Sequence, residues 1–394
     1  MVANLSKMGQ RSFATNDGGT KKNMGSSFYR GETINYNPYV EEYDKDDFLA
    51  NYVLKGWLPN GPVISRGTKI TAFGSCFAAH ITQHLSKIGF DLSRDRDSGI
   101  YISSMGEGLV NTHALLGQFE WALLDKRQPE NLWHGFKAEG YGYDEEIRQR
   151  TRKVFLETEF FIITLGLSEV WYDEDTGGVF WRAVPLRNFD AARHKFRVST
   201  FAETKANLAR IYGLIRQFAP RAKVLFTLSP IPLAATFRPV SCLTANSASK
   251  AILRAALDEM LREHAADLNT QLFYFPSYEI AQELFPKRFR EDGRHPAHGI
   301  VATIMKTFES VYCQGGTTLA ESEAEFRAVR ARNLKLLEQE AEEWSSADGE
   351  SSDRGKRREQ KQAEREDRRE KRRARKRSLR DESDVQTKNA RAET

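Results

Sequence analysis

Ser75 is the residue whose neighbours best suit it to act as a nucleophile. It follows Gly74 at the point where an apolar run, 70–73, gives way to the spacing of an amphipathic helix over 77–88. Because glycine lacks a Cβ atom, the chain can turn sharply there and leave the next hydroxyl exposed at the end of a strand. The first amides of the following helix would then face a developing oxyanion. This pattern is typical of a nucleophile elbow.

Asp292 and His295 form a second candidate group, in the loop DGRHP at 292–296. An aspartate three residues before a histidine in a tight turn can bring carboxylate and imidazole together. The carboxylate then orients the ring and stabilises its protonated form. Because a proline and a helical pattern over 297–310 follow, we expect His295 in a loop at the start of a helix. With a serine hydroxyl, this pair would complete a Ser-His-Asp triad.

Each group also has a purely structural alternative. A glycine and a serine at such a junction are commonly a turn residue and a helix cap, and Asp292 can cap the helix after it. Two other nucleophiles are conceivable. Ser247 stands three residues before Lys250, as in Ser-x-x-Lys enzymes, and Cys76 adjoins Ser75, although we expect its side chain to point into the helix packing. The presence of both motifs in one chain favours the triad.

The segments around these residues resemble the GSCFA family, whose signature Gly-Ser-Cys-Phe-Ala stands at 74–78. Further segments follow in the family's order, at 164–171 (TLGLSEVW), 227–233 (TLSPIPL), 246–250 (NSASK), 274–279 (YFPSYE) and 292–296. The family is similar to a branch of the SGNH, or GDSL-like, hydrolases, and the resemblance covers about 68–308. By position, it implies Ser75 as nucleophile, His295 as base and Asp292 as the carboxylate that orients the base.

The expected oxyanion hole departs from the SGNH pattern. SGNH enzymes use a glycine from a second block and an asparagine from a Gly-x-Asn-Asp third block. Here the third block is Gly166-Leu167-Ser168-Glu169, so Ser168 replaces the asparagine. Because one oxyanion donor contributes about 2.7–4 kcal/mol to transition-state stabilisation, the substitution implies a weak esterase, a different donor or acyl transfer.

Four nearby residues are candidates to complete the site. Asn111 is the nearest side-chain amide and Gly108 a candidate backbone donor, but Asn111 fits equally well as a helix N-cap before the apolar stripe of Leu115, Leu116 and Phe119. Asn246 and Lys250 fall in the resembling segments, and we expect them to brace the site without taking part in the chemistry.

The apolar pattern predicts an α/β fold. Four runs predict strands, at 68–73, 160–165, 223–228 and 272–275, and helical patterns lie between and after them, at 76–89, 109–124, 201–218, 249–264 and 297–310. Continuously apolar strands that alternate with helices are typical of a parallel sheet covered on both faces. We therefore expect a three-layer α/β/α fold with a mainly parallel central sheet, SGNH- or flavodoxin-like.

The ends of these strands should meet at one edge of the sheet. Ser75, Gly166, Ser229 and Pro276 each follow a predicted strand, and ligands bind at the carboxyl ends of such strands. The stretches 125–155 and 172–200 are predicted to be long loops or insertions that can roof the site.

Composition predicts one large domain with appendages: a polar extension over 1–45, the GSCFA domain over 46–315 and a charged helical or disordered tail over 316–394. Hydrophobic residues make up 40% of the chain, and 24 Phe and 6 Trp supply a bulky core. No apolar stretch suits a transmembrane helix, and the polar N-terminus lacks the core of a secretory signal. The three cysteines have neither disulfide nor metal spacing, so we expect a cytoplasmic protein without metal or cofactor.

The positive charge is concentrated near the end of the chain. The formal net charge is +5, but 354–380 holds fifteen Lys and Arg against five Asp and Glu, which leaves the rest mildly acidic. This stretch is either a solvated, partly helical tail or a segment that binds a polyanion, RNA or an anionic membrane surface. Because it has no aromatic residue, we expect phosphate or headgroup contacts and no base stacking.

Two functions are consistent with these features. The first is a serine ester hydrolase or acyltransferase that acts on an O-acyl substrate through an acyl-enzyme, with an O-acetylated carbohydrate as the substrate that the resemblance implies. The alternative is a non-catalytic GSCFA-fold protein that keeps the elbow as architecture and recruits RNA or another polyanion through its tail.

Deleting residues 350–394 is expected to leave the folded domain and any esterase activity intact, because the tail carries few apolar residues with which to join a core. Soluble yield, thermal unfolding and acetyl-ester cleavage of the truncated chain test this. Loss of soluble expression or of activity would show that the tail is more than an appendage.

Overall fold

The computed structural model describes residues 13–17, 20–24, 35–92, 97, 99–104, 108–127, 143–297 and 299–342. The chain divides into two compact units, Met1–Val329 and Arg330–Thr394. The second unit is helical over 330–342, and the basic stretch 354–380 lies outside the described residues. The elements that position the candidate site all belong to the first unit.

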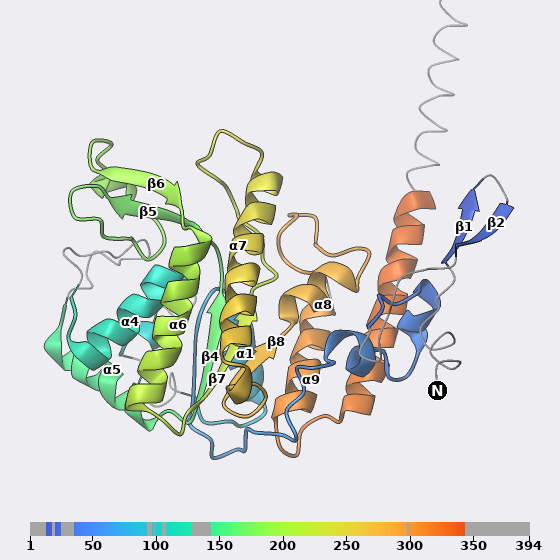
Figure 1. Cartoon of the computed structure of the whole chain (residues 1–394), viewed down its shortest axis with the longest axis horizontal. Helices are drawn as coiled ribbons and strands as arrows, with labels where there is room; N and C mark the ends of the chain where they lie inside the picture. The colour runs from blue at the N-terminus through green and yellow to red at the C-terminus, as the bar shows by residue number, and fades with distance from the viewer. Residues whose placement is uncertain are drawn as a thin grey trace, which may run out of the picture. The chain divides into compact units, whose positions relative to one another are not determined.

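A four-stranded parallel sheet forms the centre of the first unit (Figure 1). Its order is β3-β4-β7-β8, with strands at Ile70–Gly74, Phe160–Leu165, Lys223–Leu228 and Leu272–Phe275. The sequence predicted all four strands, because each is buried on both faces and therefore continuously apolar.

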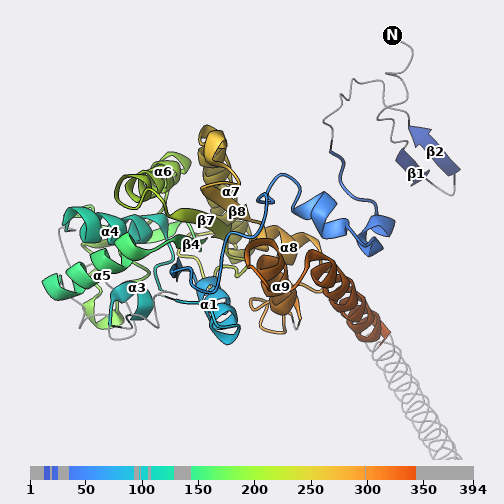
Figure 2. The same cartoon turned by 90° about the horizontal axis from the view of Figure 1, so that it is seen from below.

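Helices cover both faces of the sheet (Figure 2). Alternate side chains of β4 enter two separate cores: Phe161 and Ile163 pack on one side, and Phe160 and Ile162 on the other. The first side is covered by α4 (Thr112–Leu124), α5 (Glu145–Glu157), α6 (Phe201–Phe218) and α7 (Cys242–Glu263). The second is covered by α1 (Phe77–Lys87), α8 (Ser277–Glu283) and α9 (Ile300–Tyr312). The predicted three-layer α/β/α fold is confirmed.

The topology places the end of β3 at a switch point. After α1 the chain returns as Leu92, which forms a parallel bridge with Ile70, whereas β4 pairs in parallel with the other edge of β3. The next two extended segments along the chain, Leu92 and then β4, therefore lie on opposite sides of β3. In open parallel sheets, the crevice at such a point is where ligands bind.

Several boundaries differ from the sequence-based expectation. The stretch 125–155 contains most of α5, which begins after Asp144 because the carboxylate of that residue accepts a bond from Ile147 N–H. α7 begins at Cys242, earlier than the predicted 249, because Ser241 caps it. The stretch 172–200 contributes to a hairpin of β5 (Glu169–Asp173) and β6 (His194–Val198).

The smaller elements complete the first unit. A second hairpin, β1 (Phe13–Asp17) with β2 (Thr20–Met24), lies in the predicted polar extension. The short helix α3 spans Tyr101–Ser104. The last helix of the first unit begins at 319, where a charged helical segment was expected, and its Phe326 and Val329 are buried in the second core.

Gly74 allows β3 and β4 to approach each other closely at the elbow. Its φ is +133°, and a Cβ atom at this position would lie 2.1 Å from the carbonyl oxygen of Thr164. Residue 74 must therefore be glycine for two separate reasons, the backbone conformation and the contact with the neighbouring strand.

Lys250, a buried residue of α7, connects the ends of two strands. Its Nζ donates to the carbonyl oxygens of Gly166, after β4, at 2.7 Å and of Ser229, after β7, at 2.8 Å. Burial lowers the pKa of this amine to about 7, although the nearby Cys76 opposes the shift. Lys250 thus fixes the separation of two loops that border the site.

Replacing Gly74 with alanine is expected to lower the free energy of unfolding by about 2–4 kcal/mol, because the new methyl group must displace backbone. Gly177→Ala is the matched control: φ there is +71°, but no atom lies within 4 Å of the new Cβ. Chemical denaturation of both variants measures the difference. Equal decreases in the free energy of unfolding would show that the contact between the new methyl group and Thr164 does not destabilise the protein.

Replacing Lys250 with methionine should expose the pH dependence of the buried amine. Between about pH 7 and 10.5 the unfolded chain binds more protons than the folded one, so the stability of the wild type relative to Lys250→Met should rise with pH. Denaturation of both proteins at pH 7 and pH 9.5 tests this. A stability difference that does not change with pH would contradict it.

Candidate active site

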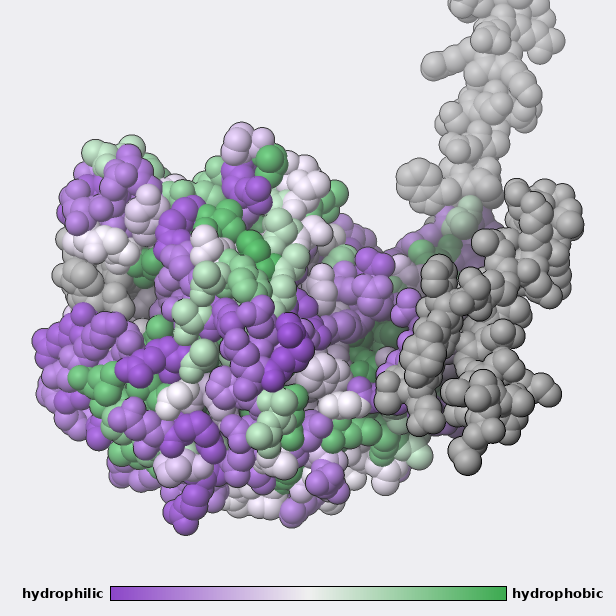
Figure 3. Space-filling model, in the orientation of Figure 1, coloured by the Kyte–Doolittle hydropathy of each residue, from purple (hydrophilic) through white to green (hydrophobic). Residues whose placement is uncertain are grey.

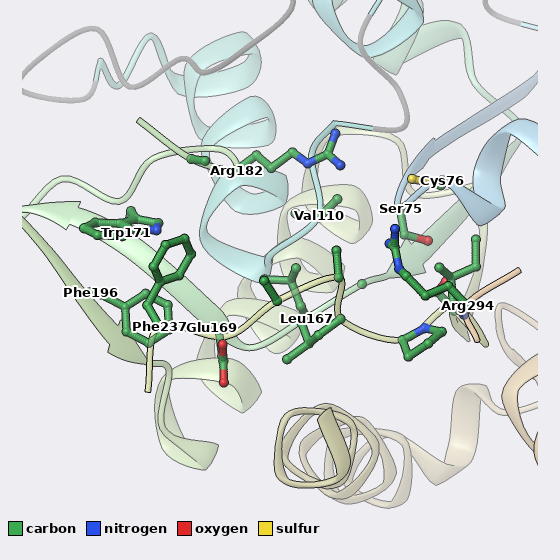
Figure 4. Close-up of a pocket in the computed structure, with 18 residues that line it drawn as sticks. Ser75, Cys76, Val110, Leu167, Glu169, Trp171, Arg182, Phe196, Phe237 and Arg294 are labelled. Carbon is green, nitrogen blue, oxygen red and sulfur yellow. The ribbon is translucent and has the colours of Figure 1, made fainter. Parts of the chain in front are cut away.

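A cavity of about 270 Å³ opens at the carboxyl ends of β3, β4 and β7 (Figure 4). Ser75 and Cys76 border it after β3, Gly166 and Leu167 after β4, and Ser229 after β7. Three of the four predicted strand ends therefore meet here. Pro276, after β8, lines another cavity beside Trp57 and Tyr274, because β8 is one strand further along the sheet.

Ser75 is held at the elbow by Thr164 of the neighbouring strand. Its N–H lies 2.7 Å from Thr164 Oγ1 and 3.0 Å from the Thr164 carbonyl oxygen, and its hydroxyl donates to the same Oγ1 at 3.0 Å. Phe77 N–H, in the first turn of α1, donates to the Ser75 hydroxyl at 3.3 Å. The hydroxyl therefore lies between the end of a strand and the start of a helix, as the elbow pattern predicts.

Thr164 is a site residue that the sequence analysis did not single out. It is fully buried, and its place in an apolar strand gave no reason to expect more than a packing role. A signal was present: it is the polar residue of the strand FFIITL, two residues before the predicted third-block glycine.

Asp292 and His295 form the expected pair. Asp292 Oδ2 lies 2.5 Å from His295 Nδ1, and Asp292 Oδ1 accepts from the backbone N–H groups of Arg294 and His295, each at 2.9 Å. The bond from His295 and the two backbone bonds hold the pKa of the Asp292 carboxyl well below its usual range. The carboxylate is therefore charged at neutral pH and orients the imidazole, with Nε2 left for another partner.

The serine and the histidine do not touch in this structure. Among the described residues, no hydrogen bond joins Ser75 to His295, whose side chain is about half exposed. The loop that carries the histidine nevertheless reaches the cavity, because the preceding residue, Arg294, lines it together with Ser75. Two of the three expected triad residues are thus paired, beside the cavity that Ser75 lines.

Asn111 has the contacts of a helix cap. Its Oδ1 accepts from Ala114 N–H, and its Nδ2 donates to the carbonyl oxygens of Phe180 and Trp181 at 3.0 and 2.9 Å. Of its two expected roles these bonds favour capping, because both amide hydrogens are taken and none is left for an oxyanion. Gly108 is buried in the turn before α4, two residues from the cavity-lining Val110.

The third-block residues have different surroundings. Gly166 lines the cavity, and a Cβ atom there would lie 3.3 Å from Ser75 Cβ and 2.7 Å from Val110 O, so only glycine lets these segments meet. Ser168 is buried, does not line the cavity and donates its N–H to Ser249 Oγ. Glu169 faces the cavity and accepts a bond from Thr236 at 3.0 Å.

Asn246 and Lys250 have the contacts of bracing residues. Asn246 Oδ1 accepts from Leu233 N–H at 3.0 Å and so holds the loop after β7, while Lys250 holds the carbonyls described above. The Lys250 amine bonds to Gly166 and Ser229 and not to Ser247, which speaks against a Ser-x-x-Lys nucleophile. Cys76, expected to point into the helix packing, lines the cavity beside Ser75.

The far end of the cavity is aromatic. Trp171 meets Phe237 edge to face with ring centroids 4.8 Å apart, and Phe196 lies 5.3 Å from Phe237. Phe237 is 62% exposed. Figure 3 shows hydrophobic surface, in green, near the tip of the β5–β6 hairpin and the start of α7. The stretch 172–200, expected as a roof, contributes Arg182, Ala183 and Phe196 to the lining.

The described residues bring together no group of three or more His, Cys, Asp or Glu side chains able to hold a metal ion. Within the same residues, we find no helix with the length and apolar character needed to cross a bilayer.

The solved structures that resemble the chain include two enzymes. One is a salicylyl-acyltransferase from a tetracycline biosynthetic pathway (10% identity, TM-score 0.27), with 70% of this chain and 55% of that chain covered. The other is an acetyl xylan esterase from the rumen bacterium Butyrivibrio proteoclasticus (11% identity, TM-score 0.27), with 71% and 66% covered. This chain therefore spans less than two thirds of either protein. Among curated proteins, none matches the sequence.

The model of the GSCFA family matches residues 69–308. This range is more than half of the chain, and it includes the elbow, the third block and the loop of Asp292 and His295. The chain belongs to the GSCFA family.

Proposed function

We propose that this protein is a serine acyl hydrolase or acyltransferase that acts on an O-acyl ester, with Ser75 as nucleophile, His295 as base and Asp292 as the carboxylate that orients it. One observation carries the proposal. The Ser75 hydroxyl lies at the elbow between β3 and α1 and faces a cavity that the Asp292–His295 loop also borders.

The reaction would follow the usual course of acyl transfer. His295 Nε2 takes the hydroxyl proton as Ser75 Oγ attacks the ester carbonyl, and the same proton passes to the alcohol as it leaves. Water or another acceptor then attacks the acyl-enzyme, and Ser75 regains its proton. This course requires the 292–296 loop to bring His295 Nε2 within about 2.6–3.2 Å of Ser75 Oγ, a bond that is often long without substrate.

Oxyanion stabilisation would come from backbone amides. The N–H of Ser75 is bonded to Thr164, the amide of Asn111 is occupied, and Phe77 N–H in the first turn of α1 donates to Ser75 itself. We therefore assign this role to the backbone N–H of Gly108. An O-acetylated carbohydrate is the substrate class that we propose, since the aromatic end of the cavity, Trp171 and Phe237, offers faces and edges against which a sugar ring can pack.

The second candidate function is a non-catalytic binding protein. The observation that favours it is the hydroxyl of Ser75, which is bonded to Thr164 rather than to a histidine. In that case the elbow is architectural, and a polyanion such as RNA would bind through the basic tail.

Ser75→Ala and His295→Ala should each lower the rate of acetyl-ester cleavage by at least about 10³-fold, because triad members act as a unit. Ser86→Ala, an exposed serine of the same helix α1, is the matched control and should cleave at the wild-type rate. A fluorophosphonate probe should label the wild type at Ser75 and leave Ser75→Ala unlabelled. Equal cleavage by all four proteins would end the catalytic proposal, and RNA binding that survives Ser75→Ala would support the alternative.

A further inference from the structure

Arg294 brings into the candidate active site a cation for which the described residues supply no ion-pair partner. It lines the same cavity as Ser75, and Figure 4 shows its side chain extending toward Ser75. Its Nε is shielded from solvent and has no hydrogen-bonding partner among the described residues. The side chain as a whole is partly exposed, and its unpaired Nε in the cavity wall suggests a partner that the substrate supplies.

The nearby carboxylates are already engaged. Asp292 accepts from the imidazole of His295 and from two backbone amides, one of them the N–H of Arg294 itself. Glu169 accepts from Thr236, and Figure 4 shows it on the far side of Leu167 from Arg294. Within the described part of the chain, the Arg294 guanidinium forms no ion pair.

We propose that Arg294 determines substrate specificity by binding a carboxylate that the ester substrate carries close to its scissile carbonyl. This inference rests on the proposed function and narrows its substrate class to acidic esters, such as an O-acetylated acidic sugar. A carboxylate is the anion that fits best, because the planar guanidinium matches two carboxylate oxygens, and a doubly charged phosphate would call for further donors.

The shape of the cavity supports this assignment. Arg294 lies at the end that holds Ser75, whereas Trp171, Phe196 and Phe237 lie at the opposite end (Figure 4). A substrate with its anion near the ester and a ring further away would meet both ends. Direct contact with the anion makes Arg294 a binding residue; it takes no part in proton transfer.

The test compares 3-acetoxybenzoate with its neutral methyl ester, which differ in the charge near the acetyl ester. In the wild type, kcat/KM should be higher for the carboxylate, and Arg294→Gln should lower the ratio of the two values by about tenfold or more. Arg294→Lys should keep part of the preference for the carboxylate over the methyl ester, because lysine retains the positive charge. Arg221→Gln, an exposed arginine just before β7 at the other end of the sheet, should leave the ratio unchanged. Thermal unfolding shows whether each variant is folded.

The outcomes separate this inference from the proposed function. Cleavage of both esters with the same ratio in wild type and Arg294→Gln would overturn the inference and leave the function standing. An equal loss with both esters would identify Arg294 as an oxyanion donor, which also overturns it. If neither ester is cleaved, calorimetric binding to Ser75→Ala and to the double variant Ser75→Ala/Arg294→Gln decides. A preference for the carboxylate that the second substitution removes supports the inference, and no such preference overturns it.

Discussion

The bonds between Thr164 and Ser75 are the interaction on which the candidate site depends. They join the ends of two parallel strands at the point where the chain connections diverge, and they fix the position of the hydroxyl before any substrate is present. Gly74 and Gly166 are part of the same constraint, because a side chain at either position would separate the segments that these bonds hold together. The geometry of the elbow therefore depends on both β3 and β4, although the Gly-Ser motif that indicates it follows β3 alone.

The site is unusual in its distribution of charge. Lys250 is buried and donates to two carbonyl oxygens, and Arg294 lines the cavity with an Nε that has no acceptor among the described residues. A cation held close to the nucleophile favours negative charge in the cavity, both that of an oxyanion and that of a substrate group. The aromatic end adds apolar contact without competing for that charge. These two properties are the basis on which we propose an amphipathic, acidic ester as the substrate.

The Asp292–His295 pair sits on a loop at the cavity edge, with the histidine half exposed. The loop is a small hairpin in which Phe289 bridges Pro296, so its ends are fixed; His295 between them is exposed, whereas Arg294 lines the cavity. In the proposed mechanism, this loop would bring the imidazole to the serine when a substrate fills the cavity and excludes water. The binding of a substrate anion by the adjacent arginine would take place on the same loop.

The sequence by itself determined the layers of the fold and indicated the residues of the candidate site. Strands buried on both faces must be apolar throughout, and Gly-Ser at a junction and Asp-x-x-His in a turn are local patterns, so all of these were visible in the chain. The roles of Thr164, Asn111 and Arg294 were decided by tertiary structure. Each depends on atoms distant in the sequence: Thr164 on the register of β3 against β4, Asn111 on two carbonyl groups about 70 residues away, and Arg294 on the direction in which a loop faces. Local sequence patterns indicate which polar side chains are present. Tertiary packing determines which of them find hydrogen-bonding partners.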